Sequence, residues 1–276
     1  MKDIPIKTSH LFPLLDQKLI ELLQLLNADD WQKPTIAKLW TVKDVAAHLL
    51  DGNIRALSMS GDGYFGESPG NISSQQDLID YLNRLNAEWV KAMKRVSPSV
   101  LTGLLEITGK LFCGHIATLD PFAKAMFSVA WAGEDESQNW FHIAREYTEK
   151  WHHQQQIRDA VNKPGIMTKE LYYPVLDTFM MALPFTYRNA DAPEGTVVKI
   201  TVSGEGGGSW WLVKKDKWFL DKTVHDKVAA HTIIDGAIAW KLFSKSLRKK
   251  DVMKYVSISG DEKLGEVVLD MISVMA

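Results

Sequence analysis

The sequence predicts two units of different fold class: a bundle of four long helices over residues 1–165, then a small α+β unit over residues 166–276. Three observations lead to this prediction. Up to about residue 161, apolar residues recur every three to four positions in long segments. Near residue 196 the apolar period drops to two. The chain, at 276 residues, is also longer than one typical domain of about 150 residues.

The first two helices are predicted by leucine spacing and by a capping signal. Residues 11–26 carry leucines three and four positions apart, until a polar stretch at residues 27–30 interrupts them. The second helix begins at Thr41, a good N-cap, with Asp44 three residues later where it also suits the helix dipole. Its apolar stripe ends before residue 61, where a loop rich in Gly and Ser follows to residue 74.

Two further long helices complete the predicted bundle. One runs from about residue 75 to residue 96 and is limited by Pro98; the other runs from about residue 136 to residue 161. The stretch 99–133 is ambiguous, with a short helix opening at residues 120–121 as one interpretation. Four long amphipathic segments in about 165 residues favour an antiparallel bundle.

The second unit is predicted to mix strands and helices. Val198, Ile200 and Val202 alternate with polar residues, and a glycine-rich turn then leads to further strands, which indicates an antiparallel meander. The expected elements are, in order, a helix at 171–183, strands at 198–202, 210–213 and 218–220, a helix at 233–247, a strand at 255–259 and a helix at 261–274.

Composition excludes several classes of protein. Hydrophobic residues make up 46% of the chain and charged residues 24%, as in folded globular proteins. The 32 Lys and Arg residues against 34 Asp and Glu leave a net charge of −2, so we expect neither nucleic-acid binding nor membrane binding. No apolar run approaches the length of a bilayer span, and charges interrupt the N-terminal segment, which argues against a signal peptide. A single cysteine, Cys113, indicates a reducing cytoplasm.

Three residues of the helical unit could form a metal site. Glu149 and His153 are four apart on one predicted helix, so their side chains share a face, and His48 lies in the middle of another. A carboxylate and two imidazoles can bind one divalent ion and leave positions open for water or substrate. Such a pair is also common on solvated helices, and a lone histidine among apolar residues is often a core residue. Spacing alone therefore leaves both interpretations open.

Two segments resemble a known family. Residues 40–49 read WTVKDVAAHL, and residues 145–157 read REYTEKWHHQQQI. Together they resemble the DinB-like metalloprotein superfamily, and more narrowly its mycothiol-dependent maleylpyruvate isomerase branch. In that branch a histidine ligand follows the aspartate of the second helix by four residues, and the fourth helix carries Glu-x-x-x-His. Residues 183–276 are similar to the sterol-carrier-like domain of the same enzymes.

The resemblance implies a set of ligands and cofactors. His48, Glu149 and His153 would be the metal ligands, the metal would be zinc or nickel, and a low-molecular-weight thiol would often serve as co-substrate. Gln156 departs from the aspartate that many members of the branch carry three residues after the last ligand. Arg55, two turns past His48, is a weak candidate for holding substrate carboxylates, with a surface arginine as the alternative.

Three functions follow as competing hypotheses. The first is a metal-dependent enzyme acting on a small substrate as a thiol-linked isomerase or S-transferase. The second is a hydrolase in which the same metal activates water. The third is a non-catalytic protein whose C-terminal unit binds a small ligand. The sequence leaves the oligomeric state open between a monomer and a homodimer.

Overall fold

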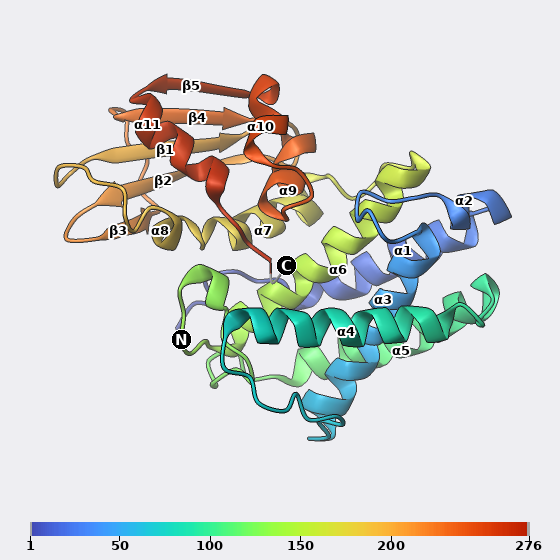
Figure 1. Cartoon of the computed structure of the whole chain (residues 1–276). Coiled ribbons are helices and arrows are strands. Elements are labelled where there is room, and N and C mark those ends of the chain that lie inside the picture. The colour runs from blue at the N-terminus through green and yellow to red at the C-terminus, as the bar shows by residue number, and fades with distance from the viewer. Residues whose placement is uncertain (1, 275–276) are drawn as a thin grey trace.

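The computed structural model describes residues 2–274, apart from the side chain of Gln75, and shows a helical part followed by a mixed sheet (Figure 1). This confirms the predicted fold class. The helices of the first part are α1 (Phe12–Gln24), α2 (Ala28–Gln32), α3 (Val42–Ala56), α4 (Gln75–Met93), α5 (Pro98–Thr118), α6 (Asn139–Val161), α7 (Lys169–Met180) and α8 (Leu183–Thr186).

Four of these helices form a closed bundle. Helix α1 packs against α5 and α6, and α3 packs against the same two helices, whereas α4 lies on α3. The helix α5 comes from the stretch that sequence patterns left ambiguous. Residues 120–133, for which a short helix was one interpretation, contain a 3-10 turn at Ala130–Ala132 and no α-helix. The pattern failed because α5 is apolar on both of its faces, so no stripe stands out.

The start of α3 is built as predicted. The Thr41 hydroxyl accepts the Asp44 backbone N–H at 3.4 Å, and the Asp44 carboxylate accepts the Thr41 N–H at 3.0 Å. After Ala56 the helix widens into one π-helical turn, Leu57–Gly61. The capping box therefore fixes the residue at which α3 begins. It also fixes the position of His48 along the helix axis, about two turns further on.

Contrary to the expectation from the sequence, one helix of the described chain, α5, is long and apolar enough to cross a membrane, by length and composition only. Its inner face carries buried Leu101, Leu105, Phe112 and Ile116 and packs on α1 and α3.

The second part contains a five-stranded mixed sheet. Its strands are β1 (Val197–Val202), β2 (Gly208–Lys214), β3 (Trp218–Asp221), β4 (Ala230–Ile234) and β5 (Val256–Gly260), in the order β3-β2-β1-β4-β5. The predicted antiparallel meander of β1, β2 and β3 is present. Strand β4 runs parallel to β1, and β5 runs antiparallel to β4. The remaining helices are α9 (Gly236–Phe243), α10 (Lys249–Val252) and α11 (Glu262–Glu266).

Two helices predicted in this part are shorter in the structure. The helix expected at 233–247 begins only at Gly236, because Ala230, Thr232 and Ile234 alternate toward the core as strand β4. The helix expected at 261–274 ends at Glu266 and continues as a 3-10 turn, Val267–Asp270.

One apolar core joins the two parts. Helices α7 and α9 lie between the sheet and the bundle (Figure 1). The indole of Trp151 stacks on Tyr172 at 4.6 Å and meets the edge of Trp240 at 6.2 Å between ring centres. The same core cluster contains residues from both sides of residue 165. The predicted division of the chain into domains at that residue stays a prediction.

Candidate functional site

The packing of α3 on α6 brings the three predicted residues together. The rings of His48 and His153 lie 4.6 Å apart between centres, at an angle of 75°. One turn away on α6, the Glu149 carboxylate oxygen Oε2 is 3.4 Å from His153 Nε2. Buried Ala47 and Leu49 anchor α3 on both sides of His48. The i,i+4 spacing on α6 was visible in the sequence, and tertiary packing supplies the third side chain.

The orientation of His153 is set by Gln156. His153 Nδ1 lies 2.9 Å from the amide oxygen of Gln156, which can only accept, so Nδ1 carries the proton. The other ring nitrogen, His153 Nε2, is the one that faces the Glu149 carboxylate. The amide nitrogen of Gln156 in turn donates to His152 Nε2 at 3.1 Å. Gln156, a departure from the family pattern, thus holds both imidazoles.

His48 is neutral and has an unused nitrogen. Burial, together with the nearby His153, holds its pKa well below the ordinary value. Among the described residues nothing bonds to its buried Nδ1 atom. The indole of Trp40 lies 4.9 Å from the His48 ring and 6.4 Å from the His153 ring, so it covers the pair.

A small cavity of about 40 Å³ opens beside these residues. Its wall is formed by His48, Leu49, Gly52, Phe112, Glu146, Glu149, Lys150 and His153. That volume holds a few water molecules at most. The cavity is therefore large enough for an ion with its water, and a larger substrate requires side chains to move.

Lys150 and Glu146 in this wall were missed by sequence reasoning. The Lys150 ammonium donates to the Asn53 side-chain oxygen and lies 4.2 Å from the Phe112 ring centre. Burial lowers the pKa of Lys150. Burial opposes ionisation of Glu146, but Arg145 and His142 together outweigh that effect and lower the Glu146 pKa. Only their neighbours from α3 and α5 reveal them, since a charged residue on an amphipathic helix ordinarily faces water.

Arg55 stands apart from the cavity wall. Its guanidinium is 3.6 Å from the Asp51 carboxylate, one turn back on α3. The Arg55 Nε atom is buried and, within residues 2–274, has no partner. Its role toward a substrate stays a prediction.

His48, Glu149 and His153 are residue types that bind metal ions, but their side chains are not spaced to hold one as they stand. No three His, Cys, Asp or Glu side chains in residues 2–274 are placed to hold an ion as they stand. Two features nevertheless fit a cation: among the described residues His48 Nδ1 has no partner, and His153 Nε2 and the Glu149 carboxylate lie 3.4 Å apart beside the cavity.

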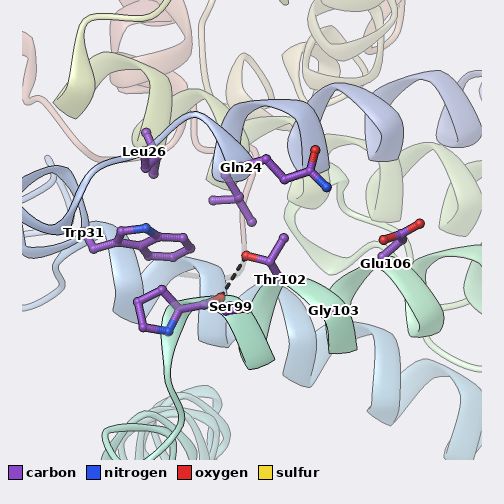
Figure 2. Close-up of a pocket in the computed structure, with 9 residues that line it drawn as sticks. Gln24, Leu26, Trp31, Ser99, Thr102, Gly103 and Glu106 are labelled. Carbon is purple, nitrogen blue, oxygen red and sulfur yellow. Dashed lines mark hydrogen bonds between the residues drawn. The ribbon is translucent and has the colours of Figure 1, made fainter.

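A larger cleft lies elsewhere on the bundle. It has a volume of about 480 Å³ and is bounded by Leu23, Gln24, Leu26, Trp31, Pro98, Ser99, Thr102, Gly103 and Glu106 (Figure 2). Among these, Glu106 alone is ionisable. Because size without reactive groups does not make an active site, we place the candidate site at the smaller cavity.

Comparison with known proteins supplies a family. Residues 12–158, more than half of the chain, match the model of the mycothiol maleylpyruvate isomerase N-terminal domain. No curated protein matches the chain. The crystal structure of the mycothiol-dependent maleylpyruvate isomerase is similar to this chain with 12% identity, a TM-score of 0.52 and 91% of each chain covered. A histidine-to-alanine mutant of that enzyme is similar with 11% identity, a TM-score of 0.50 and the same coverage.

At such identity the solved structures show a shared fold, and the match over residues 12–158 covers α1, α3, α5 and most of α6, the helices that build the bundle and hold the three candidate ligands. The chain belongs to the mycothiol-dependent maleylpyruvate isomerase family.

Proposed function

We propose that this protein is a metal-dependent enzyme that uses a low-molecular-weight thiol to isomerise a small substrate or to transfer a group to it. The observation that carries the proposal is the meeting of His48, Glu149 and His153 at a cavity inside the bundle of a chain from this family. Cys113 is half-buried, and burial raises the pKa of its thiol to about 11, so it suits poorly as the nucleophile. We expect the enzyme to work in the cytoplasm.

We propose His48, Glu149 and His153 as the ligands of one divalent ion, zinc or nickel. Each can offer a lone pair: a neutral imidazole on α3, a carboxylate, and an imidazole held by Gln156 with Nε2 free. Such an ion, when bound, would lower the pKa of a thiol or water and keep it anionic at neutral pH. Three protein ligands leave a position open for that group.

The residues around the ligands have separate roles in this proposal. Gln156 keeps the His153 ring in one tautomer and one orientation. Trp40 covers the two imidazoles and limits the entry of water. The Lys150 ammonium brings positive charge to the cavity wall, where it would favour an anionic reactant.

The first test is the metal content of the purified full-length protein. We expect about one divalent ion per chain in the wild type, little in a His48→Ala, His153→Ala double variant, and a reduced amount in Glu149→Gln. A His225→Ala variant, which changes a histidine of the sheet part, is the matched control and should keep its metal. Full occupancy in the double variant would exclude this site.

The second test separates the thiol enzyme from the alternatives. After cobalt substitution, a bound thiol should add charge-transfer absorption, and Cys113→Ser should leave both the spectrum and the activity nearly intact. If a panel of cellular thiols left the spectrum unchanged while esters or amides were turned over, the protein would be a hydrolase. A folded protein without metal would instead favour a small-ligand-binding protein.

A further inference from the structure

The outward face of α5 is apolar and exposed. Val100, Leu104, Ile107 and Leu111 are 55%, 37%, 61% and 58% exposed. Their spacing of four, three and four residues places them on one stripe along the helix. The opposite face of α5 is already used, since it packs on α1 and α3. Within residues 2–274 this stripe has no covering element.

The composition of α5 is that of a helix covered on every side. Across its 21 residues the charged side chains are Glu106 and Lys110, with His115 near the end. A helix that is apolar all round is ordinarily buried. The stripe covers roughly 400 Å², and continuous apolar patches of this size on a protein surface are often functional. Such a surface indicates a partner.

We infer that this face of α5 pairs with the same face of a second copy of the chain, in an antiparallel two-fold dimer. The apolar residues of the stripe are separated by four, three and four positions. Helices that pair along their length carry apolar contact residues at the same alternating spacing of three and four. A two-fold dimer uses one patch on both copies, so a self-complementary patch is what it requires. The inference concerns assembly and does not depend on the proposed function.

The charges beside the stripe support a second copy of this chain as the partner. At about 100° per residue, Glu106 and Lys110 lie on the same side of the stripe. They form an ion pair of 2.9 Å within the helix. With a two-fold axis near residue 108, Lys110 lies opposite Glu106 of the partner subunit, and the reciprocal pair forms at the same time. The charged edge formed by Glu106 and Lys110 can therefore pair with the same edge of a second copy.

The size of the surface predicts a weak dimer. A stable interface needs roughly 800 Å² per copy, about twice the stripe. The cleft of Figure 2 adjoins the same helix at Gly103 and Glu106 and offers additional surface to the partner. We therefore expect a dissociation constant in the micromolar range.

Sedimentation equilibrium of the full-length protein, from about 1 to 300 µM, tests the inference. We expect concentration-dependent dimerisation, and an Ile107→Lys variant that is folded by circular dichroism but dimerises at least tenfold more weakly. Val224→Lys adds the same charge at another exposed apolar position, in the sheet part, and should dimerise like the wild type. A monomer at every concentration, or equal dimerisation of a folded Ile107→Lys variant, would overturn the inference.

A mixing experiment tests the charged edge independently of Ile107. Glu106→Lys and Lys110→Glu each place like charges across the two-fold axis, so each variant alone should remain monomeric. An equimolar mixture should dimerise again, because both cross pairs then join opposite charges. Changes within one helix cannot be rescued by mixing, so a mixture that stays monomeric contradicts the pairing. Binding of a monomeric wild type to phosphatidylcholine vesicles would instead assign the stripe to a membrane.

Discussion

The interiors of the two parts differ in the chemistry that they bury. In the described chain the buried charged and imidazole side chains all lie in the helical part, such as Asp44, Arg145 and His152. Beyond residue 187, the buried polar residues are Thr232, Ser244 and Ser273. Two of these hydroxyl groups have a hydrogen-bond partner. The Thr232 hydroxyl donates to the Gly265 carbonyl at 2.7 Å, and the Ser273 hydroxyl donates to the Phe179 carbonyl at 3.1 Å.

This difference indicates where function resides. Burying a polar group costs free energy unless it is fully bonded, so a part built only for stability keeps such groups out. Among the described residues the sheet part buries no charged or imidazole side chain, while the bundle places an ammonium, two imidazoles and two carboxylates around one cavity. We therefore regard the sheet part as the stabilising element and the bundle as the reactive one.

The largest effect is expected where the two parts share one core. Trp240 of α9 is almost fully buried and contacts Trp151 and His152 of α6. Trp240→Ala should lower the free energy of unfolding by about 3–5 kcal/mol, because it leaves a large cavity. Urea denaturation followed by circular dichroism measures it. A loss below about 1 kcal/mol would mean that this contact does not hold the parts together.

A smaller loss is expected from breaking the buried polar chain of the bundle. Asn53 accepts from Lys150 and donates to the Thr108 hydroxyl at 3.0 Å. Asn53→Leu should cost about 2–3 kcal/mol, because it leaves a buried ammonium without an acceptor. Adding Lys150→Met should recover at least half of that loss. Additive losses in this double-mutant cycle would show that the two side chains do not depend on each other.

The two parts should lose stability in different pH windows. Burial lowers the pKa of His142, so the folded state keeps it neutral while the unfolded state is protonated below about 6.5. The folded state is therefore not penalised by His142 above about pH 6.5, and its stability falls as pH falls below that value. In the sheet part, the Thr223 N–H, which donates to the Asp221 carboxylate at 3.0 Å, lowers the Asp221 pKa to about 2.

The stabilising effect of Asp221 is therefore present above its unfolded pKa, near 4, and is lost as pH falls toward about 2. Comparing His142→Gln and Asp221→Asn with the wild type by thermal unfolding from pH 7 to pH 2 separates the two. His142→Gln should flatten the profile just below pH 6.5, and Asp221→Asn only below pH 4. A His142→Gln profile parallel to the wild type would contradict the assignment.

The smallest effect is a gain in stability. Both amide atoms of Gln154 are buried and lack a partner among the described residues. Gln154→Met should raise the free energy of unfolding by about 1 kcal/mol, since it removes the cost of two unmet hydrogen bonds. Gln156→Met is the matched comparison and should lose stability, because that amide bonds both His152 and His153. A loss in both variants would indicate that Gln154 has partners in solution.

Local signals in the sequence predicted most helices and four of the five strands. The capping box of Thr41 and Asp44, the leucine spacing of α1 and the alternation in β1 are set by residues a few positions apart, so they could be read directly. Helix α5 and strand β4 could not. Both depend on a neighbour distant in the chain: α5 is apolar on two faces, and β4 is defined by its parallel pairing with β1.

The candidate site divides in the same way. The sequence by itself determined the pairing of Glu149 with His153, because four residues make about one turn of any α-helix. Only the tertiary structure decided that His48 meets this pair, that Gln156 orients it and that Lys150 lies in the same cavity. The physical reason is that the rotation and register of α3 against α6 come from side chains packing along both helices, which no local pattern encodes.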